Sequence, residues 1–166
     1  RLLSRPFDEV LASGKPDYPF CLAWANHDWT TKTWKNNGGT TMIAEQLYPG
    51  KEDYINHFNV VLPAFKDHRY ITVDGKPLFC IFDPYRFPDV EEFMELWRKL
   101  AKENGLEGVY FVAMCNSTTT MVRDADGRIH RVLPNLESSE AVYKSFLNMG
   151  FDGINSLGKS RAEMLY

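Results

Sequence analysis

The spacing of apolar residues along the chain predicts helices that alternate with short strands. Within Glu52–Lys66, apolar residues recur at i, i+1, i+4, i+7, i+8 and i+11, which places them on one helical face. The expected helices are Pro6–Ser13, Glu52–Lys66, Asp89–Asn104 and a last one that is capped by Ser138 or Ser139 and ends at Met149. Apolar runs too short for a helix predict strands at Pro19–Ala25, Pro77–Phe82, Gly108–Cys115 and Phe151–Leu157. This alternation indicates an α/β protein built from parallel βα units.

Two turn signals add antiparallel pieces to this pattern. Asp74-Gly75 separates Tyr70–Val73 from the second strand and predicts a β-hairpin. Asp126-Gly127 predicts a second hairpin, an excursion between the third strand and the last helix.

Three further local features have a clear physical reading. Pro63 should end or kink its helix, because proline leaves the carbonyl four residues earlier unpaired. Trp97 lies in register with the apolar stripe of its helix, so we expect it in the core and not at a ligand. Residues 41–46 are expected as a short extended segment after a polar loop.

The order of the elements leaves two architectures open. A weak repeat, Asn104–Val109 and Met149–Ile154, twice joins a helix end to a strand start through a pair of glycines. A doubly wound sheet and a (β/α)8 barrel both satisfy this order. No glycine-rich phosphate loop follows any strand, so the usual support for a nucleotide-binding doubly wound sheet is missing.

Polar and aromatic residues gather where the first strand should end. The stretch PFCLAWANHDWTTKTW places an amide, an imidazole, a carboxylate and three indoles within eleven residues. Ligands of parallel α/β folds bind at the carboxyl ends of strands, and stacked aromatic rings beside hydrogen-bonding groups suit a sugar ring. The plainer alternative is that Trp24 belongs to the core and the rest is a solvated loop.

The other strands should bring further polar residues to the same edge. The predicted carbohydrate-binding residues are Trp24, Asn26, His27, Asp28, Trp29, Trp34, Asp83, Tyr85, Asn116 and Asn155, with Ser156 beside them. Glycoside cleavage usually needs two carboxyl groups, and Asp28 and Asp83 are the only candidates that this placement supplies. Asp83 precedes Pro84 and could equally be a turn residue that bonds its own backbone.

Composition narrows the possible partners. The chain has 166 residues and a net charge of -3 without a basic block, which argues against nucleic acid. No apolar run reaches the roughly 20 residues of a membrane span. Cys21, Cys80 and Cys115 fall in apolar strand runs without zinc spacing, so we expect buried reduced thiols, no metal and no cofactor. Reduced thiols favour the cytoplasm.

The motif WANHDW resembles the Trp-Ala-Asn-Glu-x-Trp signature of the WbsX-type glycosyltransferase family, which shares a barrel domain with glycoside hydrolase family 99. The lead-in Leu2–Trp29, the segment Ala64–Pro84 and GFDGINS at Gly150–Ser156 also resemble this family. The resemblance implies a (β/α)8 barrel, of which these four strands would form about half. Residues 1–166 would then be a single partial domain, completed by the remainder of a parent chain.

The same resemblance shapes the expected function. It implies a glycosyltransferase of bacterial surface polysaccharide, such as lipopolysaccharide or O-antigen. The alternatives are a family 99-like hydrolase of mannose-containing glycans and a non-catalytic glycan-binding module. In such relatives the acidic pair lies in an Asn-Glu-Trp-x-x-Glu-like segment, which this chain lacks. The catalytic residues are therefore unknown from this sequence.

One position departs from the family pattern. The signature's glutamate falls on His27 here, with Asp28 beside it. A histidine at this place should contact sugar as a neutral donor or acceptor and bind less well once protonated. The alternative is that His27 only packs against Trp29 or Trp34.

An open half-barrel has a cost in stability. Its edge strands would be unpaired, and its apolar interior, including Leu22, Phe79 and Phe111, would be partly wet. The isolated chain is therefore expected to be poorly stable unless it dimerises.

Overall fold

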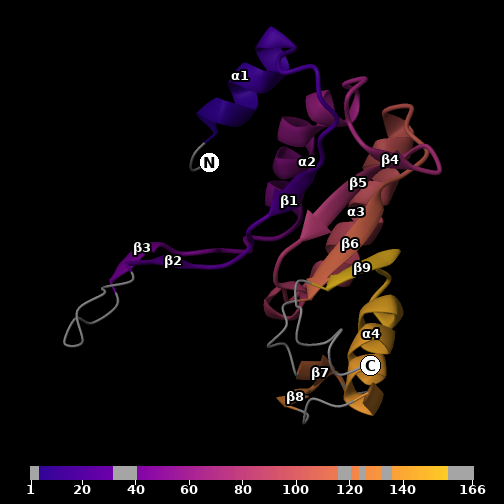
Figure 1. Ribbon diagram of the computed structural model, residues 1–166. Coiled ribbons are helices and arrows are strands. Elements are labelled where there is room, and N and C mark those ends of the chain that lie inside the picture. Colours follow the sequence, from indigo (N-terminus) through magenta and orange to yellow (C-terminus); the bar gives the residue numbers. More distant parts are fainter. Residues whose placement is uncertain (1–3, 32–40, 116–120, 124–125, 132–135, 157–166) are drawn as a thin grey trace.

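The computed structural model describes residues 4–31, 41–115, 121–123, 126–131 and 136–156 (Figure 1). Its centre is a sheet whose four parallel strands lie in the order β1 (Leu22–Trp24), β5 (Lys76–Ile81), β6 (Tyr110–Cys115) and β9 (Gly153–Ser156). Register is continuous across it, with Leu22 opposite Phe79 and Phe79 opposite Phe111. The predicted parallel βα arrangement is confirmed.

Four α-helices connect and cover these strands. They are α1 (Arg5–Ser13), α2 (Lys51–Phe65), α3 (Val90–Glu103) and α4 (Leu136–Asn148), and a 3₁₀ turn, η1 (Pro84–Arg86), follows β5. Figure 1 shows α2 and α3 behind the sheet. Trp97 of α3 packs on Phe79 of β5 with ring centroids 4.8 Å apart, which fixes this layer against the sheet.

The core lies between the sheet and the layer of α2 and α3. Trp97 is fully buried, as its place in the stripe predicts, and its indole N–H donates to the Tyr54 carbonyl at 2.9 Å. Phe79 and Phe111 are also fully buried, which corrects the expectation that they would be partly wet. Alternate side chains of a strand point to opposite faces, and these two point at the helices. Leu22, the third residue of that expectation, is partly buried.

Local signals fixed several boundaries correctly. The hairpin at Asp74-Gly75 joins β4 (Thr72–Val73) to β5, and both turn residues have the positive φ, 51° and 74°, that such a turn requires. Gly14 and Gly105 end α1 and α3 with φ of 67° and 81°.

Other boundaries differ from the prediction. β1 is shorter than Pro19–Ala25, because Phe20 pairs only through an isolated bridge to Tyr70. α2 continues through Pro63 but ends at Phe65, so the proline lies in the last turn of the helix. α4 begins at Leu136, so Ser138 and Ser139 lie inside the helix and do not cap it.

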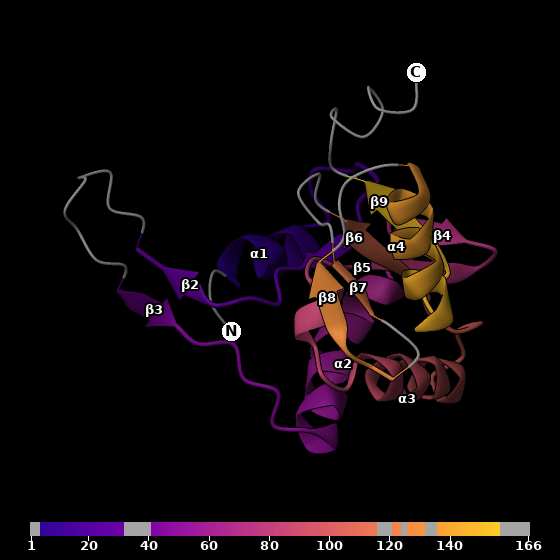
Figure 2. The same cartoon turned by 90° about the horizontal axis from the view of Figure 1, so that it is seen from below.

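Two small hairpins leave the main sheet. β7 (Met121–Arg123) pairs with β8 (Ile129–Arg131), as Asp126-Gly127 predicts. β2 (Trp29–Thr30) pairs with β3 (Met42–Ala44), where only an extended segment was expected. Figures 1 and 2 both show this second hairpin, which we call the arm, extending away from the sheet and the helices.

Within the described residues the sheet is open. β1 and β9 are its end strands, and no barrel is closed, so the half-barrel remains an expectation. Cys80 is buried, whereas Cys21 is exposed at the open edge, which corrects the expectation of buried thiols for that residue. The Cys115 side chain lies outside the described part.

Candidate carbohydrate-binding site

The carboxyl ends of β1 and β5 are joined by one buried amide. Asn26 is fully buried, and its side-chain N–H group donates to the Asp83 carbonyl at 2.8 Å, while its side-chain oxygen accepts from the Asp83 N–H at 2.7 Å. The same amide N–H group donates to the Tyr48 hydroxyl at 3.1 Å, which in turn donates to the Asn26 carbonyl at 3.0 Å. Asn26 therefore positions the ends of two strands.

Tyr48 belongs to the shell around this junction. Its ring stacks on Phe87 with centroids 4.5 Å apart and meets Trp24 edge-on. Burial raises the pKa of the Tyr48 hydroxyl, so the group stays protonated and serves as a hydrogen-bond donor.

The two predicted carboxylates have different partners. The Asp28 carboxylate accepts a hydrogen bond from the backbone N–H of Gln46 at 2.7 Å, which connects the two chain segments at the base of the arm. Asp83 forms an ion pair with Arg86 at 3.1 Å in the turn that follows β5. Each carboxylate is thus held by a neighbouring segment at the carboxyl end of its strand.

His27 has an unusual environment. Its ring lies tilted on Phe82 with centroids 5.0 Å apart. Its Nδ1 atom is buried and has no hydrogen-bond partner among the described residues. Buried polar atoms are normally paired, so this nitrogen is an exception among the described residues.

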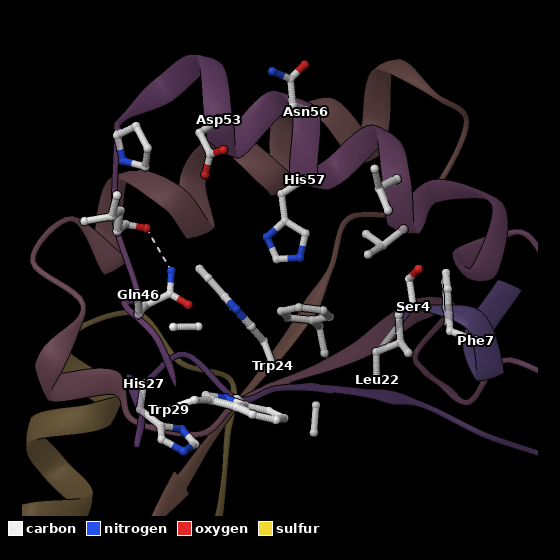
Figure 3. Close-up of a pocket in the computed structure, with 18 of the residues that line it drawn as sticks. Ser4, Phe7, Leu22, Trp24, His27, Trp29, Gln46, Asp53, Asn56 and His57 are labelled. Carbon is white, nitrogen blue, oxygen red and sulfur yellow. Dashed lines mark hydrogen bonds between the residues drawn. The ribbon is translucent and has the colours of Figure 1, made fainter. Parts of the chain in front are cut away.

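A cavity of about 750 Å³ lies beside β1, between α1, α2 and the base of the arm (Figure 3). Trp24, His27 and Trp29 line it together with the linker from β3 to α2. Figure 3 shows Phe7 of α1 and Ser4, which precedes this helix, on the side opposite Gln46. Its volume falls in the range of small-molecule sites.

The two indoles of the cavity are held differently. Trp24 is half-buried and meets His57 edge-on at 4.7 Å and Phe87 at 5.4 Å, so its orientation is fixed by packing. Trp29 is 37 % exposed and leaves ring surface open to a ligand. A fixed indole beside an accessible one suits a sugar, whose apolar ring face stacks on aromatic surface.

Sequence reasoning missed the contribution of α2. Asp53, Asn56 and His57 also line the cavity, and Figure 3 shows His57 pointing from α2 toward Trp24. The signal was present as helical spacing: i, i+3 and i+4 place these polar residues on one face, next to the apolar stripe. Only the packing of α2 beside β1 reveals that this face borders a cavity.

The remaining predicted ligands lie elsewhere. Tyr85 is buried, its hydroxyl is hydrogen-bonded to Ser145 of α4, and its ring packs on Phe146. Asn155 is exposed near the end of β9. Neither residue lines the cavity. Trp34 and Asn116 lie outside the described residues.

The described residues lack two further features. They contain no group of three or more histidine, cysteine, aspartate or glutamate side chains arranged to hold a metal ion. None of the helices described is both long and apolar enough to cross a membrane.

The chain belongs to the family described as Glycosyltransferase WbsX, whose family model matches residues 1–155. This membership suggests a carbohydrate-related function.

Curated relatives agree with this assignment. The chain is 27% identical over 111 residues to the "Uncharacterized protein WxcX" of Xanthomonas campestris pv. campestris strain B100, and equally to that of strain ATCC 33913. The match covers 66% of this chain and 15% of each relative, so the chain spans a small part of their length. No solved structure matches the chain.

Proposed function

We propose that this chain forms the sugar-binding part of a glycosyltransferase that builds bacterial surface polysaccharide of the lipopolysaccharide or O-antigen type. The observation that carries the proposal is the cavity beside β1, where Trp24 and Trp29 lie next to hydrogen-bonding side chains. Membership of the WbsX family supports sugar transfer as the reaction.

In this proposal the cavity residues have distinct roles. Trp29 stacks on the ring face of the sugar, and Trp24 forms the floor beneath it. His27 lines the cavity and bonds a sugar hydroxyl through its imidazole, at the position where the family signature has glutamate. Asn26 acts indirectly, because its amide holds the strand ends on which these side chains sit.

Predicted residues outside the cavity lining remain part of the proposal at the carboxyl edge of the sheet. Asp28 and Asp83 follow β1 and β5 and supply carboxylates, and Asn155 supplies an amide on β9. Each can bond sugar hydroxyls of a glycan longer than one ring.

The reaction is tested by product analysis. The parent protein is incubated with a panel of nucleotide sugars and bacterial glycan acceptors, and separately with mannan. Release of nucleoside diphosphate with elongation of the acceptor is expected. Freed mannose-type sugar without nucleoside diphosphate would instead establish the hydrolase alternative. Sugar binding with neither product would leave a glycan-binding module, and a folded protein that neither binds nor reacts would refute the proposal.

A further inference from the structure

Among the described residues that line the cavity, the two carboxylates are Glu45 and Asp53, and no lysine or arginine is present. Arg5 and Arg86, in neighbouring segments, pair with Glu9 at 2.6 Å and with Asp83 at 3.1 Å. Lys51 begins α2 outside the lining and is followed directly by Glu52 and Asp53.

The start of α2 does not reverse this balance. A helix N-terminus by itself favours anions. Here Glu52 and Asp53 already occupy the first turn of α2, so their carboxylates offset the partial positive charge of the exposed N–H groups. Glu45, Glu52 and Asp53 outnumber Lys51 here, so an anionic ligand meets a net negative charge from these described residues.

The remaining lining is suited to uncharged hydroxyls. The carboxylates of Glu45 and Asp53 can accept hydrogen bonds from sugar hydroxyls, and the amide of Gln46 can both accept and donate them. His27 adds an imidazole to this lining.

We propose that this cavity selects neutral or amino-sugar glycans and excludes anionic ones, both uronic acids and the diphosphate of a nucleotide sugar. The cavity is then the place of the acceptor glycan, and the nucleotide of the donor binds elsewhere in the parent protein. This inference rests on the proposed function, which it deepens by assigning the class of sugar.

A matched pair of ligands tests the selectivity. β-1,4-mannotetraose and β-1,4-tetramannuronate share ring and linkage and differ only in the oxidation of C6 to a carboxylate. Chitosan tetraose adds a cationic ligand, and uridine diphosphate represents the donor nucleotide. Binding to the purified protein is measured by calorimetry and by tryptophan fluorescence at neutral pH and low salt, where charge repulsion is least screened.

The expected result is that a neutral or cationic tetrasaccharide binds at least about tenfold tighter than tetramannuronate, and that uridine diphosphate does not compete. The double substitution Glu45→Gln and Asp53→Asn should reduce this ratio by about threefold or more. The control is Glu95→Gln with Glu107→Gln, which removes the same charge from exposed positions outside the cavity. Circular dichroism checks that both variants are folded.

These outcomes distinguish the proposed charge selectivity from the proposed sugar site. Equal binding of mannotetraose and tetramannuronate, competition by uridine diphosphate, or an unchanged ratio in the cavity variant would overturn the charge selection while leaving the sugar site in place. Binding of no tetrasaccharide by the folded protein would overturn the sugar site itself, and the selectivity with it.

Discussion

Asn26 and Asp83, 57 residues apart, form a closed pair of hydrogen bonds between a side-chain amide and a backbone peptide group at the ends of β1 and β5. Both bonds are shorter than 3 Å, and Asn26 is fully inaccessible to solvent. The pair fixes where the chain leaves the sheet for His27, Asp28 and the arm. Asn26 makes four hydrogen bonds within the described residues: two with the Asp83 backbone and two with the Tyr48 hydroxyl.

The first prediction tests that positioning role. Asn26→Ala should lower the free energy of unfolding by about 2–4 kcal/mol, because it leaves the Asp83 N–H and carbonyl buried without their partner. Urea unfolding followed by circular dichroism measures the change. Asn59→Ala, an exposed position on α2, is the control and should change stability by less than about 0.5 kcal/mol. Equal effects of the two substitutions would show that the Asn26 bonds contribute nothing.

The second prediction concerns acid stability. Asp67 accepts three hydrogen bonds from Arg69, from Nε at 2.8 Å, Nη2 at 2.6 Å and the backbone N–H at 2.9 Å, which hold the pKa of this carboxyl well below its ordinary value. Because the folded-state pKa is lowered, the stabilisation is present above the unfolded pKa of about 3.9 and is lost as the pH falls below it.

Asp67→Asn tests this dependence. The variant should unfold at lower urea than the wild type at pH 7, and the gap should shrink at pH 3, where the unfolded carboxyl is protonated. Arg69 also donates to the carbonyls of Val10 and Pro16, so the loss should loosen α1. Asp74→Asn, in an exposed turn that tolerates asparagine, is the control. A gap of equal size at both pH values would contradict the prediction.

The third prediction separates structure from binding at Tyr85. Its hydroxyl is buried and hydrogen-bonded to Ser145, whose own hydroxyl donates to the Val142 carbonyl at 2.8 Å. Tyr85→Phe should lower the free energy of unfolding by about 1 kcal/mol and leave glycan affinity unchanged. Unfolding and calorimetric binding are measured on the same preparation, with Ser145→Ala completing a double-mutant cycle. A loss of affinity without a loss of stability would make Tyr85 a ligand of the sugar.

The fourth prediction concerns Trp29. Trp29→Ala should weaken glycan binding by about tenfold, because it removes an indole that is open to the sugar, and it should leave the unfolding midpoint nearly unchanged. Ile43→Ala, on the paired strand of the arm but outside the cavity lining, is the matched control. Similar affinities of the two variants would exclude Trp29 as a stacking platform.

The fifth prediction concerns His27. His27→Gln should weaken glycan binding by about threefold or more, because the imidazole that lines the cavity is lost. Calorimetry at one pH measures the affinities of the wild type and the variant. Equal affinities would mean that the histidine at this position has no effect on binding.

The sequence by itself determined the elements whose causes are local. An apolar stripe followed by Gly105 predicts α3, and the pair Asp74-Gly75 predicts the β4–β5 hairpin. Both signals are local, because helical periodicity and positive φ depend on neighbouring residues. Short motifs were also enough to indicate the WbsX family, and the family model matches residues 1–155.

Tertiary structure decided what the polar residues do. Asn26 meets Asp83 and Tyr48 only after parallel pairing brings distant segments together, so its burial is invisible in WANHDW. Likewise, Asp53 and His57 become cavity residues only because α2 packs beside β1. A side chain's neighbours across a sheet or between layers depend on register and packing over tens of residues, whereas its secondary structure depends on those within one or two turns.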